Sequence, residues 1–407
     1  MLLSLIFQAC LIDLHAQYET SPEIIIKALT NKDCQTAKAL LSSFKDLNFR
    51  DKAGATVLIY SSINGCYEVA NELLNRGADP DLRTYDGFTA LHMAARNGQS
   101  EILKLLLENR ANPEILTKGG ATALYLAAEK GHADIVKMLL DKGVKTDVQA
   151  NGEFTALYIA SQNGYFEIVK LLIDKGARLE LPTNRGATAL FIASSTGQYD
   201  IAKLLLDSGA KIDPRTRRGA TPLFVASQDG HLEIVKLLLD NGAPIDLLTN
   251  DGLSALSVAS GRGNTEIVKL LLIKKAKVDL RGDTGFTALY LAAGEGHSDI
   301  VNLLLENGAD INLPTKEGAT ALIYSSQKGR AETVKLLLEK GAKIDLQTDQ
   351  GVTALIIASL MGNVEVVRLL LEKGANRDLK TSDGKSAIDL AKTDEIKTLL
   401  TQNSKTK

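Results

Sequence analysis

Apolar and polar positions recur at helical spacing in short stretches, and residues 218–246, RGATPLFVASQDGHLEIVKLLLDNGAPID, show the arrangement in full. Thr221 can cap a helix, because its hydroxyl can accept a hydrogen bond from an otherwise unpaired amide of the first turn. Pro222 suits the first helical position, where its missing N–H costs nothing. The pattern predicts a short apolar helix over 223–227, with its end at Gly230.

A second helix is predicted directly after this turn. Glu233 stands at its start, where the positive end of the helix dipole favours an acid. Ile234, Leu237 and Leu238 recur at helical spacing and predict a buried stripe. Gly242 can take the left-handed conformation that commonly ends a helix. The stretch therefore predicts a pair of helices, each with its own start and stop.

The same pair of helices is predicted every 33 residues along the chain. The helix-capping position holds threonine or serine at Thr56, Thr89, Thr122, Thr155, Thr188, Thr221, Ser254, Thr287, Thr320, Thr353 and Ser386. Seventeen residues after each of the first ten caps stands a leucine, from Leu73 to Leu370. Twelve residues after each of the same caps stands an acid, from Glu68 to Glu365. A fixed period of this length predicts an array of repeats, each burying its apolar face on its neighbours.

Three consecutive pattern elements carry a resemblance to a known family: G-x-T-x-L, then A-A/S-x-x-G, then I-V-x-x-L-L-x-x-G-A. Residues 87–95 (GFTALHMAA) and 131–136 (GHADIV) show them well. The chain resembles the ankyrin-repeat family over ten complete repeats, about residues 51–382. The resemblance implies an all-α solenoid of stacked antiparallel helix pairs with β-turn fingers, in which the first helix of each pair lines the concave side.

The chain departs from the family pattern at a few positions. Alanine replaces the usual proline after the capping threonine in most repeats, and only Pro222 keeps it. Arg110 and Lys275 stand where a left-handed glycine ends the second helix, and each is expected to cost about 1–2 kcal/mol. Glu153 stands where the other repeats carry glycine, with Gly152 one place early. The junctions at Arg110 and Lys275 are predicted to be the softer points of the array.

The two ends are expected to differ from the body of the array. Residues 18–50 are predicted to form a degenerate N-terminal capping repeat before the ten repeats of 51–382. Residues 383–407 are predicted to form a truncated C-terminal capping repeat and a polar tail. Terminal repeats of such arrays need polar outer faces for solubility.

The apolar segment 1–17, MLLSLIFQACLIDLHAQ, has three interpretations. It resembles a signal peptide ending near Ala16 or Gln17, although it lacks a positive N-terminal region. Cys10 invites a lipid anchor, although the residues before it match a lipidation motif poorly. The third interpretation is an apolar first helix packed on the array. The location is therefore open: secreted or periplasmic with a signal peptide, cytoplasmic without one.

Composition narrows the class of function. A net charge of −2 argues against a generally basic nucleic-acid binder, and no apolar run approaches the ~20 residues that span a bilayer. The three cysteines, Cys10, Cys34 and Cys66, show no metal-binding spacing, and their odd number argues against a disulfide framework. No cofactor, metal or nucleic acid is therefore expected.

No catalytic constellation stands out. His132, His231 and His297 share one repeat position directly after the glycine between the helices, so loop structure explains their recurrence. Motifs of phosphate binding, acyl transfer and zinc proteases are missing. A non-enzymatic protein is predicted. An enzyme, or an adaptor fused to one, would need a catalytic module outside the repeats, and residues 1–50 and 383–407 are too short for one. An adaptor subunit of an enzyme complex is a less favoured alternative.

Candidate binding residues are those that vary while the frame stays fixed. One row is aromatic and follows the cap by three residues: Tyr125, Tyr158, Phe191, Phe224 and Tyr290. It predicts either packing between repeats or an aromatic-lined concave groove. A second set lies just before the glycine that closes the first helix: Arg96, Glu129, Gln162, Gln228 and Asp229. Its variation marks either recognition or freedom from packing.

A third candidate is a finger with Arg215, Arg217 and Arg218, one repeat after Arg185. It is either a solvated turn or a receptor for an acidic loop of a partner. Together these features predict a monomeric scaffold that binds another protein through its concave face and finger tips. The alternative is an exported structural spacer or an envelope-tethered protein.

Overall fold

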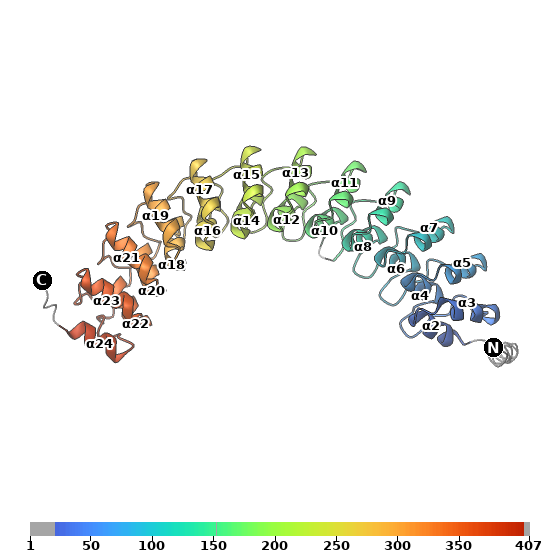
Figure 1. Ribbon diagram of the computed structural model, residues 1–407, viewed down its shortest axis with the longest axis horizontal. Coiled ribbons are helices and arrows are strands. Elements are labelled where there is room, and N and C mark those ends of the chain that lie inside the picture. The colour runs from blue at the N-terminus through green and yellow to red at the C-terminus, as the bar shows by residue number, and fades with distance from the viewer. Residues whose placement is uncertain (1–20, 152, 403–407) are drawn as a thin grey trace, which may run out of the picture. The chain divides into compact units, whose positions relative to one another are not determined.

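The structure is a computed structural model that describes residues 21–151 and 153–402. These residues form 23 α-helices and one short 3-10 helix, and no strand occurs among them. They fall into two compact units, one made mainly of residues up to Asn184 and the other mainly of residues from Lys211 onward. Within each unit the helices come in pairs that stack in chain order, as Figure 1 shows. The expected all-α architecture is confirmed.

The first helices of the ten pairs are α4 (Val57–Asn64), α6 (Ala90–Arg96), α8 (Ala123–Lys130), α10 (Ala156–Asn163), α12 (Ala189–Ser195), α14 (Pro222–Asp229), α16 (Ala255–Arg262), α18 (Ala288–Glu295), α20 (Ala321–Gln327) and α22 (Ala354–Met361). The second helices are α5 (Tyr67–Asn75), α7 (Ser100–Glu108), α9 (Ala133–Asp141), α11 (Phe166–Asp174), α13 (Tyr199–Asp207), α15 (Leu232–Asp240), α17 (Thr265–Ile273), α19 (Ser298–Glu306), α21 (Ala331–Glu339) and α23 (Val364–Glu372). The terminal helices are α2 (Pro22–Thr30), α3 (Cys34–Leu40), η1 (Leu41–Ser43) and α24 (Asp394–Thr401).

Each first helix begins and ends where the capping pattern predicts. The cap hydroxyl accepts a hydrogen bond from the amide three residues later, as from Phe224 N to Thr221 Oγ1 at 3.2 Å. Gly230 ends α14 with a left-handed φ of 85°, and Gly242 follows α15 with the same φ. These local interactions favour the start and the end of each first helix before any packing between repeats is considered.

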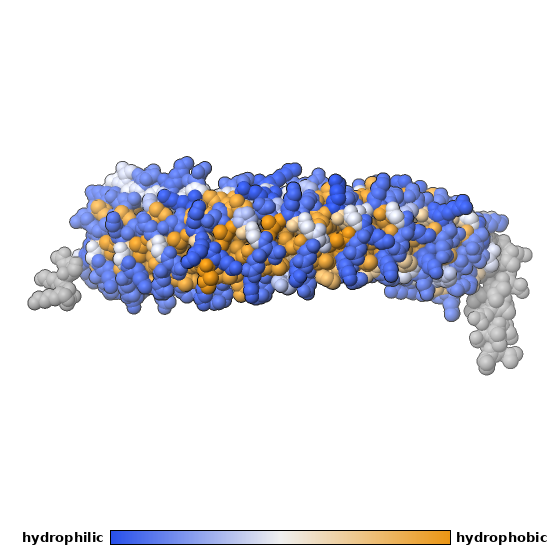
Figure 2. Space-filling model, turned by 90° about the horizontal axis from the view of Figure 1, so that it is seen from above, coloured by the Kyte–Doolittle hydropathy of each residue, from blue (hydrophilic) through white to orange (hydrophobic). Residues whose placement is uncertain are grey.

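Both helices of each pair contribute to the core, with leucines and alanines from the first helices and leucines, isoleucines and valines from the second. The leucine row is fully buried in every repeat and consists of Leu73, Leu106, Leu139, Leu172, Leu205, Leu238, Leu271, Leu304, Leu337 and Leu370. The leucine one position earlier is only half buried in most repeats, as at Leu171 and Leu237. On the face shown in Figure 2, apolar and polar side chains accordingly alternate within each unit. Truncating a buried leucine of the row should cost about 2–5 kcal/mol.

The expected left-handed junctions are confirmed. Arg110 has a φ of 64° and Lys275 a φ of 69°, and each follows its second helix in place of glycine. Glu153 also takes a positive φ, 78°, because the glycine of that finger is displaced by one position. These are sites where a side chain is held in a conformation that favours glycine.

The N-terminal end contains a disulfide, Cys34–Cys66, with 5.3 Å between the Cα atoms. The expectation that three cysteines argue against a disulfide is therefore wrong. Cys34 opens α3 and Cys66 precedes α5, so the starts of two neighbouring helices bring them together. Two of the three cysteines pair, and Cys10, like the whole segment 1–17 with its three interpretations, lies outside the described residues.

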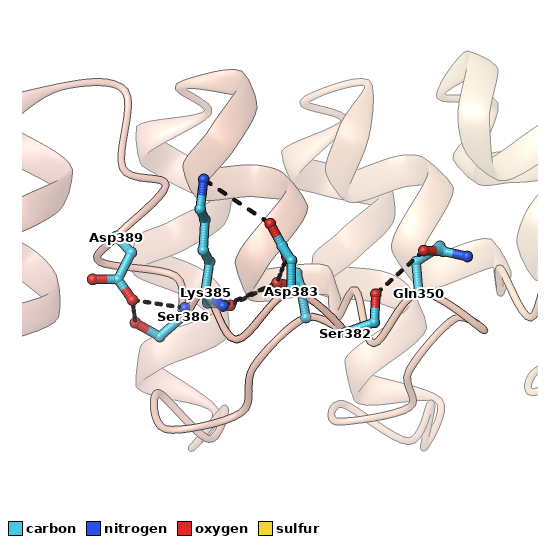
Figure 3. Close-up of polar contacts among 7 residues, drawn as sticks. Gln350, Ser382, Asp383, Lys385, Ser386 and Asp389 are labelled. Carbon is cyan, nitrogen blue, oxygen red and sulfur yellow. Dashed lines mark hydrogen bonds and ion pairs between the residues drawn. The ribbon is translucent and has the colours of Figure 1, made fainter.

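The C-terminal end is built from polar contacts, several of which Figure 3 shows. Ser386 donates from its backbone N and its hydroxyl to Asp389 Oδ2, at 2.9 and 2.7 Å. Residues 387–390 form only a turn where each earlier repeat has its first helix. Among the described residues, no helix combines the length and the apolar character needed to cross a membrane.

Candidate interaction surface

Three members of the aromatic row belong to the core. Tyr125, Tyr158 and Phe224 are 6%, 7% and 9% exposed. Tyr125 packs with Leu126 and the small side chains of neighbouring fingers, and burial raises its pKa. Phe191 and Tyr290 are half-buried. The rings of Tyr125, Tyr158 and Phe224 therefore contribute mainly to packing between repeats, because they leave almost no surface for a partner.

A phenylalanine one position before the cap explains part of this burial. Phe88 packs edge-on against His92, with ring centroids 6.1 Å apart. Phe154 packs against Tyr158 at 5.1 Å, and Phe286 stacks on Tyr290 at 5.3 Å. The two positions lie four residues apart and flank the helix start. The recurring pair of rings, one residue before the cap and three residues after it, is visible in the sequence, but it was not recognised as a sign of burial.

The ring stack continues across repeats in the C-terminal unit. Tyr290 of α18 and Tyr324 of α20 lie parallel, with centroids 4.5 Å apart, and Lys328 Nζ lies 5.5 Å from the centre of the Tyr324 ring. Gly294 makes room for this ring, since a Cβ there would lie only 2.0 Å from Tyr324 Cε1. Burial, followed by the neighbouring Tyr324, raises the pKa of Tyr290 to about 12.

The positions at the end of the first helix are more accessible than the aromatic row. Arg96, Gln162 and Asp229 are exposed, whereas Glu129 and Gln228 are half-buried. Three of them also take part in local contacts, which limits their freedom. Asp229 Oδ2 accepts from Ser195 Oγ at 2.9 Å, Asp229 Oδ1 accepts from Gln228 Nε2 at 3.2 Å, and Glu129 forms an ion pair with Lys130 at 3.4 Å.

The position directly after the closing glycine joins neighbouring repeats. His132 Nε2 lies 3.2 Å from the carbonyl of Arg96, and His231 Nε2 lies 2.9 Å from that of Ser195. Asn264 takes the same place and donates to the carbonyl of Ser227 at 2.8 Å. These side chains hold the end of the preceding first helix. No group of histidine, cysteine and acid side chains that could hold a metal occurs in the described part of the chain.

The fingers of neighbouring repeats are joined by a ladder of backbone hydrogen bonds. Each bond runs from an amide at one finger tip to a carbonyl at the tip before it, at 2.8–3.2 Å. The bonds of the ladder are Tyr85–Ala53, Lys118–Asp86 and Asn151–Gly119 in the N-terminal unit, and Arg217–Arg185, Asn250–Arg218, Gly282–Gly252, Lys316–Thr284, Asp349–Glu317 and Ser382–Gln350 in the C-terminal unit. The tips therefore have fixed positions on their neighbours.

The finger arginines have two different roles. Arg215 donates from Nε to the carbonyl of its own Gly219 at 3.3 Å, and from Nη2 to that of Leu248 in the next finger. It therefore clamps two fingers together. Arg217 and Arg218 are exposed, and within the described residues neither guanidinium has a hydrogen-bond or ion-pair partner. Arg185, one finger earlier, is also exposed.

A comparison with protein-family models decides the family of the chain. The model of "Ankyrin repeats (3 copies)" matches residues 3–84, 24–118, 77–151, 144–216, 180–249, 212–282, 256–348, 313–383 and 341–405. The chain belongs to the ankyrin-repeat family. Ankyrin repeats in general are protein–protein interaction modules, and their fold is typically that of a non-enzymatic scaffold.

Solved structures include similar ankyrin-repeat proteins. The crystal structure of the human ASB11 ankyrin repeat domain is 32% identical in sequence, and the match covers 53% of this chain and 97% of that chain with a TM-score of 0.49. Among curated proteins, none matches the chain.

One row of acids in the ankyrin repeats was missed in the sequence. Its carboxylate or amide oxygen accepts from the backbone N of the residue 31 positions later, in the next repeat. Examples are Asp81 with Asn112, Asp246 with Lys277 and Asp345 with Asn376, at 2.9–3.0 Å. An acid stands 25 residues after each of the first ten caps except Thr287, where Asn312 takes its place, so its period was the available signal. The row stabilises the junctions rather than binding a partner.

Proposed function

We propose that this chain is a non-enzymatic scaffold that binds another protein through its finger tips and through the surface formed by the ends of its first helices. One observation carries the proposal: fixed backbone contacts join the repeats, and the exposed side chains left over differ from one repeat to the next. Such a surface is ordered before the partner arrives, so little conformational entropy is lost on binding.

The proposed binding residues are the accessible ones among the sequence candidates. They are Arg96, Glu129, Gln162, Gln228 and Asp229 on the first helices, Arg185, Arg217 and Arg218 on the fingers, and the half-buried rings of Phe191 and Tyr290. Burial argues against a direct role for Tyr125, Tyr158 and Phe224. The terminal helices would act as caps, with residues 51–382 as the binding body of a monomeric chain.

Affinity capture with the full chain tests the proposal. A variant carrying Arg96→Ala, Gln162→Ala and Asp229→Ala should lose a saturable partner that the unaltered chain retains, while its circular dichroism stays the same. Retention by the variant would assign binding to another surface. If the unaltered chain retains no saturable partner, the structural-spacer alternative is favoured and the scaffold proposal fails.

We also propose that the protein works in an oxidising compartment, outside the cytosol. The Cys34–Cys66 disulfide supports this, because such bonds persist in exported proteins and are rare where thiols are kept reduced. Alkylation of the protein as it is recovered from its own cells, before any reduction, tests the idea. Both cysteines should be protected until a reductant is added. Full labelling of both without reductant would contradict export, and the mass of the mature N-terminus would then show whether segment 1–17 is retained.

A further inference from the structure

Two adjacent finger tips of the C-terminal unit carry a concentration of positive charge. Arg217 and Arg218 lie on one tip and Arg185 on the tip before it, and all three are exposed. The backbone N of Arg217 donates to the carbonyl of Arg185 at 2.9 Å, so the two tips are in direct contact. Arg217 and Arg218 are adjacent in the chain, so their like charges repel one another, and an anion bound to both would relieve the repulsion.

Arg217 and Arg218 have no counter-charge on their own tip or on the tip before it. Residues 184–186 (NRG) and 216–219 (TRRG) contain no acid. Each of the following tips of the same unit contains one acid, and Lys316 stands beside Glu317; the acids are Asp251, Asp283, Glu317, Asp349 and Asp383. No ion pair joins Arg217 or Arg218 to any of them in the described residues. Within the described residues, the side chains of Arg217 and Arg218 are therefore free to pair with a partner.

The positions of the arginines are fixed by close contacts in the backbone. A Cβ on Gly186 would lie 3.0 Å from Arg217 N, and a Cβ on Gly219 would lie 3.0 Å from Asn250 N. Both glycines have a left-handed φ, of 82° and 78°. Arg215 also donates a hydrogen bond to the carbonyl of Gly219. The tips thus present Arg217 and Arg218 from a rigid base, and only the side chains must be ordered on binding.

We propose that the finger tip 216–219 binds an acidic segment of the partner protein, with carboxylates of that segment on Arg217 and Arg218. This inference rests on the proposed scaffold function and names the partner chemistry at the fingers. A planar guanidinium matches a carboxylate with two parallel hydrogen bonds.

Nucleic acid is the less suitable anion for this surface. Single strands are held by aromatic rings that stack on bases as well as by positive charge, and neither tip has an aromatic residue. The acidic tips that follow would also repel a long phosphate backbone, and the chain as a whole has a net charge of −2. A short acidic peptide that ends before the acidic tips avoids this repulsion.

The test uses the full chain and a fluorescein-labelled ten-residue peptide of alternating aspartate and serine, followed by fluorescence anisotropy. The unaltered chain should bind it saturably, and binding should weaken as salt is raised. Replacing Arg217→Glu and Arg218→Glu together should weaken binding by at least about tenfold, since two attractive contacts become repulsive. The neutral pair Arg217→Gln and Arg218→Gln should give an intermediate loss. Lys316→Glu, a charge reversal on an exposed tip elsewhere in the same unit, is the matched control and should have little effect.

Thermal unfolding curves that coincide for all variants would show that folding is unaffected. Equal binding by the Arg217→Glu, Arg218→Glu variant and the unaltered chain would overturn the inference, as would no binding of the peptide at millimolar concentration. Tighter binding of a labelled ten-residue oligothymidylate than of the peptide would overturn it in favour of nucleic acid. Each of these results leaves the capture experiment on the first-helix variant unaffected, so failure at the fingers is distinguishable from failure of the scaffold function.

Discussion

The two ends of the array are closed by different chemistry. At the N-terminal end, α2, α3, η1 and the residue after η1 bury six apolar side chains: Ile25, Leu29, Ala37, Leu40, Leu41 and Phe44. The Cys34–Cys66 disulfide then ties α3 covalently to the start of α5. Arg76 adds hydrogen bonds to the carbonyls of Leu41, at 2.7 Å, and Phe44.

At the C-terminal end the last helix depends on polar contacts. α24 buries only Ile396 and Leu400. Arg377 Nη1 donates to the carbonyls of Leu400 at 3.1 Å and Gln402 at 2.6 Å, and Arg368 pairs with Glu395 at 3.5 Å. Exposed ion pairs contribute little to stability, so Arg377 is the main polar tie. The comparison teaches that the N-terminal end resists fraying as long as the disulfide stays oxidised, whereas the C-terminal end is insensitive to reductant.

The largest expected effect comes from the disulfide. Replacing Cys34→Ala and Cys66→Ala should cost about 2–4 kcal/mol, because the unfolded chain gains the freedom of a long loop. Hydrogen exchange should accelerate in residues 22–43 and stay the same in residues 394–401. Reductant should reproduce the effect in the unaltered chain and add nothing to the variant. Unchanged exchange in residues 22–43 would show that apolar burial alone holds this end.

Acid should weaken the N-terminal unit through His92. Its side chain is 1% exposed, and burial lowers its pKa to about 4 from the ordinary 6.5. Between these values the unfolded chain binds a proton that the folded chain does not, so stability is full above pH 6.5 and falls as the pH drops toward 4. The loss should reach about 3 kcal/mol.

Unfolding measured by denaturant at several pH values checks the effect of His92. His92→Ile should flatten the dependence between pH 6.5 and 4, since isoleucine fills the same position at Ile59 and Ile323. His132→Asn, at a half-exposed site, is the control and should leave the slope as it is. The other described histidines, in both units, are not buried, so exchange in the C-terminal unit should change less over the same range. A slope that survives in His92→Ile would assign the pH dependence to carboxylates.

The ties made by Arg76 and Arg377 sharpen the contrast between the ends. Arg377→Met should release the last turn of α24 and cost about 2 kcal/mol there, because the carbonyls of Leu400 and Gln402 lose a charged donor. Arg76→Met should change exchange in α3 much less, since the disulfide still holds that helix. Equal effects of the two changes would mean that the disulfide does not decide the difference. Combining Arg76→Met with Cys34→Ala and Cys66→Ala should remove the protection from hydrogen exchange in α3 that the Arg76→Met variant alone retains.

Local rules made most of the fold predictable from the sequence. Caps, glycine stops and the buried leucine row recur at a fixed period, and each depends on residues within one helix pair. The left-handed backbone at Arg110 and Lys275 followed from the same register, because the family position demands that conformation whatever residue occupies it.

Features that depend on contacts between repeats were not predicted. The pairing of Cys34 with Cys66 needs the starts of two helices 32 residues apart to be neighbours, which counting cysteines does not show. Which candidate binding residues are accessible also depends on contacts between repeats. Tyr125 and Arg217 were equal candidates in the sequence, but the fingers and the following helix cover the ring and leave the guanidinium in solvent. Accessibility is a property of the stacked repeats rather than of one repeat.

The smallest effects are expected at the interior junctions, one in each unit. Arg110→Gly and Lys275→Gly should each stabilise the chain by up to about 1 kcal/mol, because relief of the left-handed conformation outweighs the extra freedom of glycine when unfolded. Gly242→Ala, at the equivalent position with a φ of 85°, is the matched control and should destabilise. Chemical denaturation measures the gain, and hydrogen exchange should slow near the altered junction while residues 22–43 and 394–401 keep their rates. If the rates at an end slow as well, that end and the junction open together, and the ends cannot be the independent weak points that the comparison between them requires.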